Sequence, residues 1–364
     1  MSLFAMQFFL VSPALAKSDE THNSGTHSWV PYSYEPYPFP YFVTDTERYP
    51  AAPPPDGTVN RHGELEYLAY GIFGAHWFVD AGGATWHFVT AGDPSDEAIV
   101  MIHGYPDTWY AYRHVIAELS QSHYVIAVDT LGYGQSDKRP ELDVSYSAVA
   151  ASLIELLDVI KVDRFNLISH DRGSVISDHL IATEGMSERI LAFLRTQQSF
   201  DQPHGLPRPN HTAMMTAGFH RADNLIRDLY AGNYVSVQVP EEELARLEWE
   251  WGFAGTAEAS ARTFQGTSFD IEREFRMAHT VPKMTMPVVI LQGARDPGQR
   301  PEEYYRSAEL LPNGRVVIAD TNHFIHTEAP GLFANVARRL FIFKNSDRPD
   351  LISYEYPDFI YPEK

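Results

Sequence analysis

The chain has 364 residues, no cysteine and a formal net charge of −20. An acidic body repels nucleic acid and anionic membrane surfaces, so neither is expected as a partner. The lack of cysteine excludes disulfides, thiolate catalysis and cysteine-based metal sites.

An apolar run opens the chain from Leu3 to Ala16 and ends in Ala14-Leu15-Ala16. These features are typical of a secretory signal peptide, although no basic residue precedes the run. We therefore expect residues 1–16 to be a signal peptide and the protein to be secreted or periplasmic; without export it would be cytoplasmic. No stretch approaches the roughly twenty apolar residues that a membrane span requires, so none is expected.

Residues 17–73 form an N-terminal extension rich in proline and tyrosine, as in Pro31-Tyr32-Ser33-Tyr34. Prolines remove backbone donors, so this stretch predicts neither helix nor sheet. Its aromatic side chains favour a segment wrapped on the body over a disordered leader. The C-terminal tail, residues 345–364, has a similar composition. The two ends could pack together or against a second copy of the chain, which leaves a homodimer open.

Between these ends, eight apolar or alternating runs predict strands, and the segments between them have helical spacing. The runs are His76–Asp80, Thr85–Thr90, Ile99–Ile102, Tyr124–Val128, Phe165–Ile168, Ile190–Leu194, Val288–Leu291 and Arg315–Ile318. Such alternation predicts a mostly parallel eight-stranded sheet with helices on both faces and reactive loops at the carboxyl ends of its strands. The first two strands, joined through Gly82-Gly83, predict an antiparallel hairpin at one edge.

The regular alternation stops in residues 198–284, where the spacing turns helical and His, Trp, Tyr and Met are frequent. This insertion between the sixth and seventh strands predicts a helical cap, which would keep water out of a site below it. Residues 74–197 and 285–344 then form the core of the fold.

Three side chains that follow strands predict a nucleophile, an acid and a histidine: Asp171, Asp296 and His323. Asp171 is the centre of Ser169-His170-Asp171-Arg172-Gly173, a pattern that presents its middle side chain above the sheet. A serine that attacked a saturated carbon would form an ether, whereas an aspartate forms an ester that histidine-activated water can hydrolyse. The aspartate therefore indicates an alkylating substrate. His326 is a rival to His323, but it falls where the following helix would begin.

A second loop, Ile102-His103-Gly104-Tyr105-Pro106, also follows a strand. Its glycine permits a sharp turn, so the backbone N–H groups of Tyr105 and Arg172 are the candidates for an oxyanion hole. Further candidates for the walls of the pocket are His103, which we interpret as bonding within its loop, Trp109, Trp249 and Trp251. Histidines and carboxylates with the spacing of metal ligands are absent from the sequence, so we expect no metal and no other cofactor.

These motifs resemble the epoxide hydrolase and dehalogenase branch of the α/β-hydrolase superfamily. The resemblance covers residues 74–344 and is carried by residues 103–113, the loop 129–136, the turn at Asp171 and the segment Asn322-His323. It implies an α/β-hydrolase fold, a small electrophilic substrate and water as the second reactant. Epoxide hydrolases of this branch protonate the epoxide oxygen with two cap tyrosines, for which Tyr230 and Tyr234 are candidates. Near the end of the cap, however, residues 261–266 lack an expected tyrosine.

An epoxide hydrolase is our first interpretation, and two kinds of dehalogenase are the alternatives. Haloalkane dehalogenases bind the halide with a tryptophan after the nucleophile and often with Asn or Glu after His-Gly, where this chain has Arg172 and Tyr105. Fluoroacetate-type dehalogenases carry Asp-Arg-Gly, so Arg172 could anchor the carboxylate of a haloacid; Val175, however, occupies the place of their second arginine. A third interpretation, a non-catalytic binding protein, would not require a nucleophile, acid and histidine.

Overall fold

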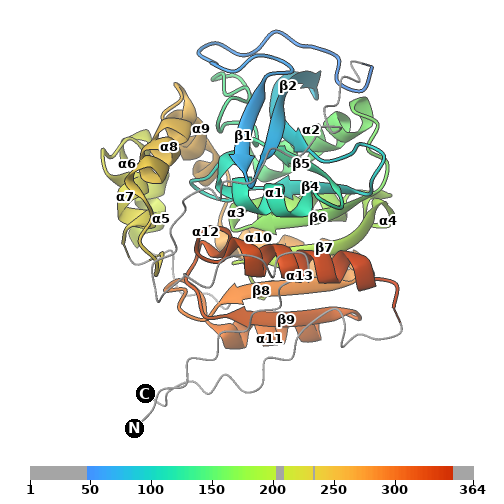
Figure 1. The fold of residues 1–364 in the computed structure, drawn as a ribbon. Coiled ribbons are helices and arrows are strands. Elements are labelled where there is room, and N and C mark those ends of the chain that lie inside the picture. Colours follow the sequence, from blue (N-terminus) through green and yellow to red (C-terminus); the bar gives the residue numbers. More distant parts are fainter. Residues whose placement is uncertain (1–46, 202–208, 233, 347–364) are drawn as a thin grey trace, which may run out of the picture.

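A nine-stranded sheet forms the centre of the molecule in the computed structural model, which describes residues 47–201, 209–232 and 234–346 (Figure 1). The strands are β1 (Leu65–Ala69), β2 (Ile72–Ala81), β3 (Ala84–Ala91), β4 (Ala98–Ile102), β5 (Tyr124–Val128), β6 (Phe165–His170), β7 (Ile190–Thr196), β8 (Val288–Gly293) and β9 (Gly314–Ala319). Their order across the sheet is β1-β2-β3-β5-β4-β6-β7-β8-β9. The first three pairs in this order, β1 with β2, β2 with β3 and β3 with β5, are antiparallel. The remaining pairs are parallel.

Eight of these strands coincide with the runs predicted from the sequence, and the predicted hairpin is confirmed by the pairing of Ala81 with Ala84. The expected number of eight strands is wrong by one, because β1 lies inside the segment that we assigned to the extension. Leu65 and Tyr67 of β1 face outward and are exposed, so this edge strand lacks the apolar alternation that marks a half-buried strand. The sheet therefore begins at residue 65 and not at residue 74.

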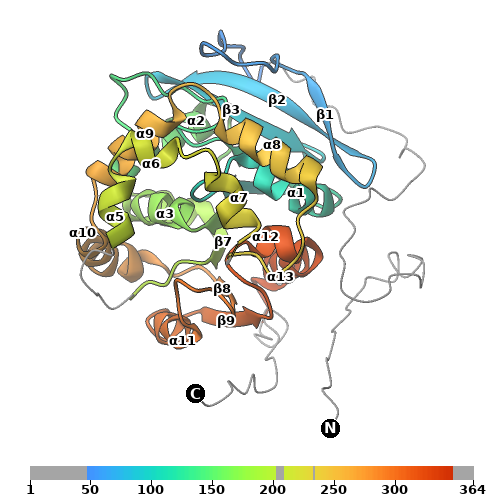
Figure 2. The same cartoon turned by 90° about the vertical axis from the view of Figure 1, so that its left-hand side faces the viewer.

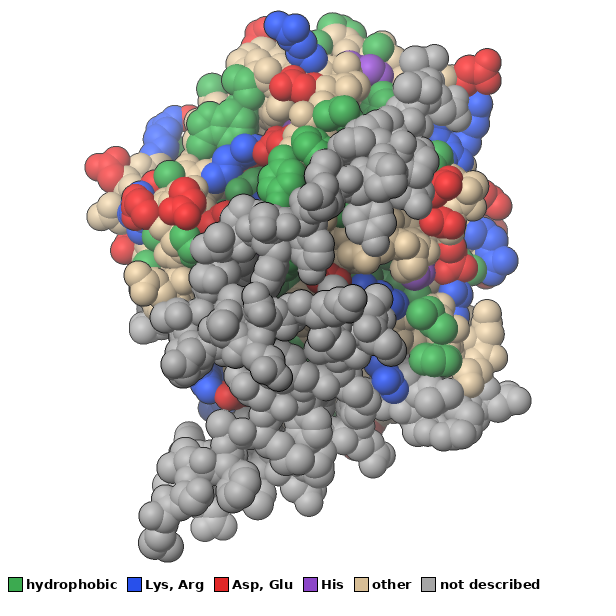
Figure 3. Space-filling model, in the orientation of Figure 1, with side chains coloured by type: hydrophobic (Ala, Val, Ile, Leu, Met, Phe, Trp, Pro, Cys, Tyr) green, Lys and Arg blue, Asp and Glu red, His purple; other side chains and the backbone are tan. Residues whose placement is uncertain are grey.

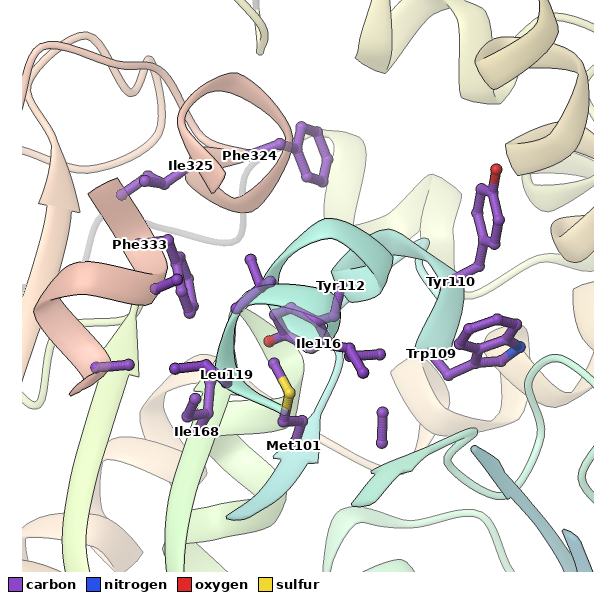
Figure 4. Packing of buried hydrophobic residues seen from close by; sticks show 14 of the residues in the cluster. Met101, Trp109, Tyr110, Tyr112, Ile116, Leu119, Ile168, Phe324, Ile325 and Phe333 are labelled. Carbon is purple, nitrogen blue, oxygen red and sulfur yellow. The ribbon is translucent and has the colours of Figure 1, made fainter. Parts of the chain in front are cut away.

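Helices cover both faces of the sheet, as predicted. They are η1 (Trp109–Tyr112), α1 (Arg113–Leu119), α2 (Tyr146–Val159), α3 (Arg172–Ala182), α4 (Met186–Arg189), α11 (Pro301–Glu309), α12 (Ile325–Glu328) and α13 (Pro330–Phe343). Successive side chains of a strand point to opposite faces, so Met101 of β4 packs under α1 and α13 while Ile102 packs under α2 and α3. In Figure 4, Met101 and Ile168 lie beneath Ile116, with Phe333 of α13 beside them.

Between β7 and β8 the chain leaves the sheet and forms a group of helices, which we call the cap. They are α5 (Pro209–Met214), α6 (Ala217–His220), α7 (Leu225–Tyr230), α8 (Glu241–Trp251), α9 (Thr256–Gln265), α10 (Phe269–Phe275), the π-helical turn η2 (Arg276–Thr280) and η3 (Val281–Lys283). Figure 2 shows α6 to α9 together on the side of the molecule that faces the viewer. Trp251 of α8 and Phe264 of α9 contact Tyr105, so these helices cover the loop that follows β4.

Both ends of the cap are attached to α3 through one buried carboxylate, that of Asp178. Arg195, at the end of β7, donates to this carboxylate at 2.7 Å and to the carbonyl of Gln198 at 2.6 Å. Arg276, where the cap returns, donates to Asp178 and to the carbonyl of Phe200. All three charged side chains are almost fully buried.

The described part of the extension lies against the sheet. Tyr49 is buried and stacks on Trp77 with ring centroids 4.4 Å apart. Glu66 of β1 forms an ion pair with Arg246 of cap helix α8 at 2.8 Å, accepts a hydrogen bond from it at 3.1 Å and contacts His76 at 3.0 Å. The strand that the sequence did not reveal therefore ties the cap to the edge of the sheet.

The expected signal peptide (residues 1–16), the extension before residue 47 and the tail from residue 347 lie outside the described residues. In the described residues, none of the helices combines the length and the apolar composition needed to cross a membrane. Figure 3 shows acidic, basic and apolar side chains interspersed on the coloured part of one face.

Candidate active site

The predicted nucleophile Asp171 lies at the turn between β6 and α3, and its backbone is strained. Its φ of 44° and ψ of −116° are unusual for a residue other than glycine. Two backbone hydrogen bonds hold this conformation, from Asp171 N–H to the carbonyl of Thr196 and from Ser174 N–H to the carbonyl of Asp171. The turn therefore presents the Asp171 side chain at the carboxyl end of the parallel strands.

Two glycines let the loop after β4 approach this turn closely. A Cβ atom at Gly173 would lie 2.4 Å from the carbonyl oxygens of Ile102 and His103, and one at Gly104 would lie 2.6 Å from the Cβ of Asp171. Because neither position has a side chain, the backbone N–H of Tyr105 reaches Asp171 and donates to its Oδ1 at 3.1 Å. One predicted oxyanion donor thus points at the predicted nucleophile. The other, the N–H of Arg172, is in the first turn of α3, where backbone donors lack helical partners.

Asp296 and His323 complete the arrangement from the loops after β8 and β9. His323 Nδ1 lies 2.9 Å from Asp296 Oδ2, and its Nε2 lies 3.8 Å from Asp171 Oδ2. Since a carboxylate only accepts hydrogen bonds, the contact with Asp296 places a proton on Nδ1 and turns Nε2 toward Asp171. The backbone N–H of Gly298 also donates to Asp296, at 2.7 Å, which fixes its orientation.

The charges around His323 change its basicity. Burial alone would lower the pKa of His323, but the charge and hydrogen bond of Asp296, with the charges of Asp171 and Asp107, raise it to about 9. Burial acts to raise the pKa of Asp296, yet His323 and the hydrogen bond from Gly298 bring it below its ordinary value. His323 is therefore mostly protonated at neutral pH, and the charges of these three carboxylates favour that form.

Behind His323 lies a buried polar cluster of Asp107, His170, His326 and Tyr230. The hydroxyl of Tyr230 donates to Asp107 Oδ1, while Asp107 Oδ2 lies 3.4 Å from His326 Nε2 and 3.7 Å from His170 Nδ1. Burial raises the pKa of Asp107 to about 7, although the hydrogen bond from Tyr230 opposes this. Burial also lowers the pKa of both histidines, that of His326 to about 3, so both are neutral. His170 Nε2 contacts the carbonyl of His323 at 3.2 Å, so the cluster supports the loop that carries His323.

Asp107, His170 and His326 are also spaced closely enough to hold a metal ion. Asp107 already accepts a hydrogen bond from Tyr230, and none of the three side chains belongs to the Asp171, Asp296 and His323 arrangement. We therefore describe them as a polar cluster that supports the site. The expectation that the chemistry needs no metal or cofactor stays a prediction.

The two candidate cap tyrosines lie in different surroundings. Tyr230 is fully buried, stacks on Phe324 at 4.3 Å and donates to Asp107, so its hydroxyl is already engaged behind the site. The ring of Tyr234 lies edge-on to His323 with centroids 5.7 Å apart, and its carbonyl accepts the backbone N–H of His323 at 3.1 Å. Of the two, the structure places Tyr234 beside the predicted base.

Residues 99–336 match the sequence pattern of the alpha/beta hydrolase family. The chain belongs to this family. Among its relatives, the soluble epoxide hydrolase of Corynebacterium sp. (strain C12) is 25% identical over 277 residues, which is 71% of this chain and 94% of that protein. Epoxide hydrolase A of Mycobacterium tuberculosis (strain ATCC 25618 / H37Rv) is 37% identical over 101 residues, 27% of this chain and 31% of that protein.

Solved structures of other proteins share the fold. The epoxide hydrolase CorEH without ligand aligns with a TM-score of 0.62 and 23% identity over 74% of this chain and 98% of that one. A haloalkane dehalogenase, the DbeA-M1 loop variant from Bradyrhizobium elkanii, aligns with a TM-score of 0.59 and 18% identity over 73% and 95%. The α/β-hydrolase fold and the resemblance to the epoxide hydrolase and dehalogenase branch are thus confirmed.

The four residues that we expected in the walls of the pocket lie in different places. Trp251 packs against Tyr105 with ring centroids 5.5 Å apart. Trp109 is instead fully buried against His76, and Trp249 is 41% exposed on α8, so neither contacts the predicted triad. His103 bonds within the loops, since its Nδ1 contacts the carbonyl of Gly104 and its Nε2 accepts from the backbone N–H of Thr130.

One contact at the site was not predicted from the sequence. His220 of α6 lies over the loop after β4, with its Nδ1 2.9 Å from the hydroxyl of Tyr105. The sequence singled out Tyr105 only for its backbone N–H. No local signal distinguishes His220 among the sixteen histidines of the chain, because its partner is 115 positions away.

Proposed function

We propose that this hydrolase converts epoxides to vicinal diols through an ester of Asp171. The observation that carries the proposal is that two groups converge on the carboxylate of Asp171. The backbone N–H of Tyr105 donates to it, and the imidazole of His323, which Asp296 orients, faces it. An aspartate in this position suits attack on a saturated carbon, because the resulting ester remains open to hydrolysis. The epoxide hydrolases among its relatives support the choice of substrate.

In the first step, an oxygen of Asp171 attacks a ring carbon and the bond from that carbon to the epoxide oxygen breaks. The departing oxygen takes a proton from a tyrosine of the cap. Of the two candidates, Tyr234 suits this role better, because it lies beside His323 while the hydroxyl of Tyr230 is bound to Asp107. Proton donation of this kind typically accelerates a reaction by about 10²–10⁴-fold.

In the second step, His323 takes a proton from water and the oxygen of that water attacks the carbonyl carbon of the Asp171 ester. Esterification removes the charge of Asp171, which is one of the charges that raise the pKa of His323. The loss of this charge lowers the pKa of His323 and favours the neutral imidazole, whose extra proton passes to solvent and whose Nε2 can then accept a proton from water. The N–H groups of Tyr105 and Arg172 would bind the oxyanion. When it collapses, the bond from the carbonyl carbon to the substrate oxygen breaks, and that oxygen takes the proton held by His323 to complete the diol. The Asp171 carboxyl group then ionises, which restores the carboxylate.

The second candidate is a dehalogenase of the haloacid type, and the surroundings of Arg172 favour it. The guanidinium of Arg172 lies 4.5 Å and 5.2 Å from the ring centres of Phe269 and Phe264. In the described part of the chain it forms no ion pair within 4 Å, and it lines a small cavity together with Glu272, Arg273 and Arg276. A free guanidinium beside Asp171 could anchor the carboxylate of a haloacid.

The two candidates differ in the ester that they form and in what leaves. The variant His323→Gln cannot activate water, so it should accumulate the Asp171 ester. Intact-protein mass spectrometry after incubation with an epoxide panel and with a haloacid panel would detect the adduct, and peptide mapping would locate it. An adduct from an epoxide, without halide release, supports the first candidate; an adduct with halide release supports the second. The double variant that also carries Asp171→Asn is the control, and an adduct that persists in it would exclude Asp171 as the nucleophile.

A further inference from the structure

The side chain of Tyr105 lies in the candidate active site, although the sequence assigned only its backbone a role. Its N–H donates to Asp171, so the residue begins within 3.1 Å of the predicted nucleophile. Its ring is buried among aromatic side chains of the cap, with Phe264 and Trp251 at centroid distances of 5.3 and 5.5 Å. The ring is therefore held between the loop after β4 and the cap, and its hydroxyl points toward His220 of α6.

That hydroxyl bonds to a histidine whose orientation is fixed. Tyr105 Oη lies 2.9 Å from His220 Nδ1, and His220 Nε2 lies 2.7 Å from the carbonyl of Met214. The indole N–H of Trp251 donates to the backbone carbonyl of His220 at 3.0 Å. Because a carbonyl only accepts, Nε2 must carry a proton. In the neutral imidazole Nδ1 is then the acceptor, and it receives the hydrogen bond of the Tyr105 hydroxyl.

A second proton on His220 would reverse this hydrogen bond. Nδ1–H would then donate to Tyr105 Oη, and the hydroxyl proton of Tyr105 would be free to turn toward a bound substrate. Only this form of the pair offers a proton to the site.

We propose that Tyr105 donates a proton to the departing epoxide oxygen and that His220 replaces it, an inference that rests on the function proposed above. As the bond from the ring carbon to oxygen breaks, that oxygen takes the hydroxyl proton of Tyr105. The Nδ1 proton of His220 moves to Tyr105 Oη in the same event. The histidine ends neutral, the tyrosine keeps its proton, and the substrate oxygen has become a hydroxyl. His220 regains its proton from solvent before the next turnover, and the hydrolysis of the Asp171 ester, which releases one proton, balances this uptake.

The surroundings explain why a tyrosine here needs a histidine behind it. Burial, with the nearby Tyr133 and the charge of Asp171, raises the pKa of Tyr105 well above its ordinary value, so a tyrosinate would be costly. Burial lowers the pKa of His220, although the carbonyl of Met214 opposes this. The neutral form of the pair therefore predominates, and the imidazolium, when it forms, is a stronger acid than that of an exposed histidine. The pair thus avoids leaving a charge on Tyr105.

The position of Tyr105 also bears on the tyrosine that is missing near the end of the cap. The run 261–266, where the resemblance led us to expect a tyrosine, contains Phe264 instead. The ring of Phe264 lies edge-on to that of Tyr105 and nearly parallel to that of His220. A hydroxyl is therefore present beside this position, but it comes from the loop after β4. Tyr234 then donates a hydrogen bond to the same oxygen, while the proton that this oxygen keeps comes from Tyr105 and not from the cap.

The variant Tyr105→Phe tests this inference because it removes the hydroxyl and keeps both the ring and the backbone N–H. Quenched-flow mass spectrometry would measure the rate of ester formation with two probes, styrene oxide and benzyl bromide. Epoxide opening needs a proton, whereas bromide leaves without one. We expect Tyr105→Phe and His220→Asn to slow ester formation from styrene oxide by about 100-fold or more, and that from benzyl bromide far less. Tyr133→Phe is the matched control, since Tyr133 lies in the same aromatic group, 6.0 Å from Trp251; it should change neither rate more than about threefold.

Three results would overturn the inference. Tyr105→Phe could keep the epoxide rate, which would make its hydroxyl dispensable. It could slow both probes equally, which would assign the hydroxyl to packing. Finally, the unmodified enzyme and His323→Gln could form an ester with benzyl bromide but none with any epoxide. That last result would refute the proposed epoxide hydrolase itself, so the two failures are distinguishable.

Discussion

Replacing His323 with glutamine should change how the stability of the fold depends on pH. In the folded protein the pKa of His323 is raised from its ordinary value of 6.5 to about 9. A raised histidine pKa contributes stability that is fully present below pH 6.5 and is lost as the pH rises through 9. At 1.36 kcal/mol for each pKa unit, this contribution is on the order of 3 kcal/mol, and glutamine cannot provide it.

Urea unfolding at about pH 6 and about pH 9.5 measures this contribution. Between these two values the free energy of unfolding of the unmodified protein should fall by about 3 kcal/mol more than that of His323→Gln. Groups that titrate in both proteins cancel in this difference. His279→Gln, which replaces an exposed histidine of η2, should keep the pH dependence of the unmodified protein. Equal slopes for the unmodified protein and His323→Gln would refute the electrostatic account of His323.

Further predictions concern the nucleophile, the cap and its attachment. Asp171→Asn removes a charge that raises the pKa of His323, so an NMR titration should give a lower His323 pKa in this variant than in the unmodified protein. An unchanged pKa would show that the charge of Asp171 does not act on His323. Tyr234→Phe should slow ester formation from an epoxide by about 10- to 100-fold in a quenched-flow assay, and an unaltered rate would remove Tyr234 from the reaction. Asp178→Asn leaves two buried arginines without their shared carboxylate and should cost about 3–5 kcal/mol in urea unfolding. Glu66→Gln should speed hydrogen exchange in α8 and leave α2 as it was, because Arg246 of α8 binds this carboxylate and its other partner, His76, lies in β2; uniform exchange changes would contradict this.

The core of the fold could be predicted because its signals are local. Each strand from β2 to β9 is a short apolar or alternating run, and Asp171, Asp296 and His323 each follow one of these runs directly. Parallel strands end at the same edge of a sheet, so side chains far apart in the sequence could be expected to meet. β1 carries no such signal, because the outward half of this edge strand is exposed.

The cap could not be predicted in the same detail. Its helices do not pair with the strands, so no local pattern in the sequence shows how they dock. The sequence therefore does not tell which tyrosine side chain faces the site and which is buried behind it. Tyr230 and Tyr234 are four residues apart, yet one bonds Asp107 and the other lies over His323. The bond between Tyr105 and His220 likewise depends on how α6 docks on the loop after β4.

The single carboxylate that gathers both ends of the cap has a consequence for protein engineering. The chain leaves the core near Phe200 and returns at Arg276, which binds both the carbonyl of Phe200 and the carboxylate of Asp178. The two ends of the cap are therefore adjacent, and the segment between them could be exchanged as a unit. A cap from another member of the family could be grafted between them without altering the register of β7 and β8. Such a chimera needs an arginine at its return point, because the buried charge of Asp178 must still be shared.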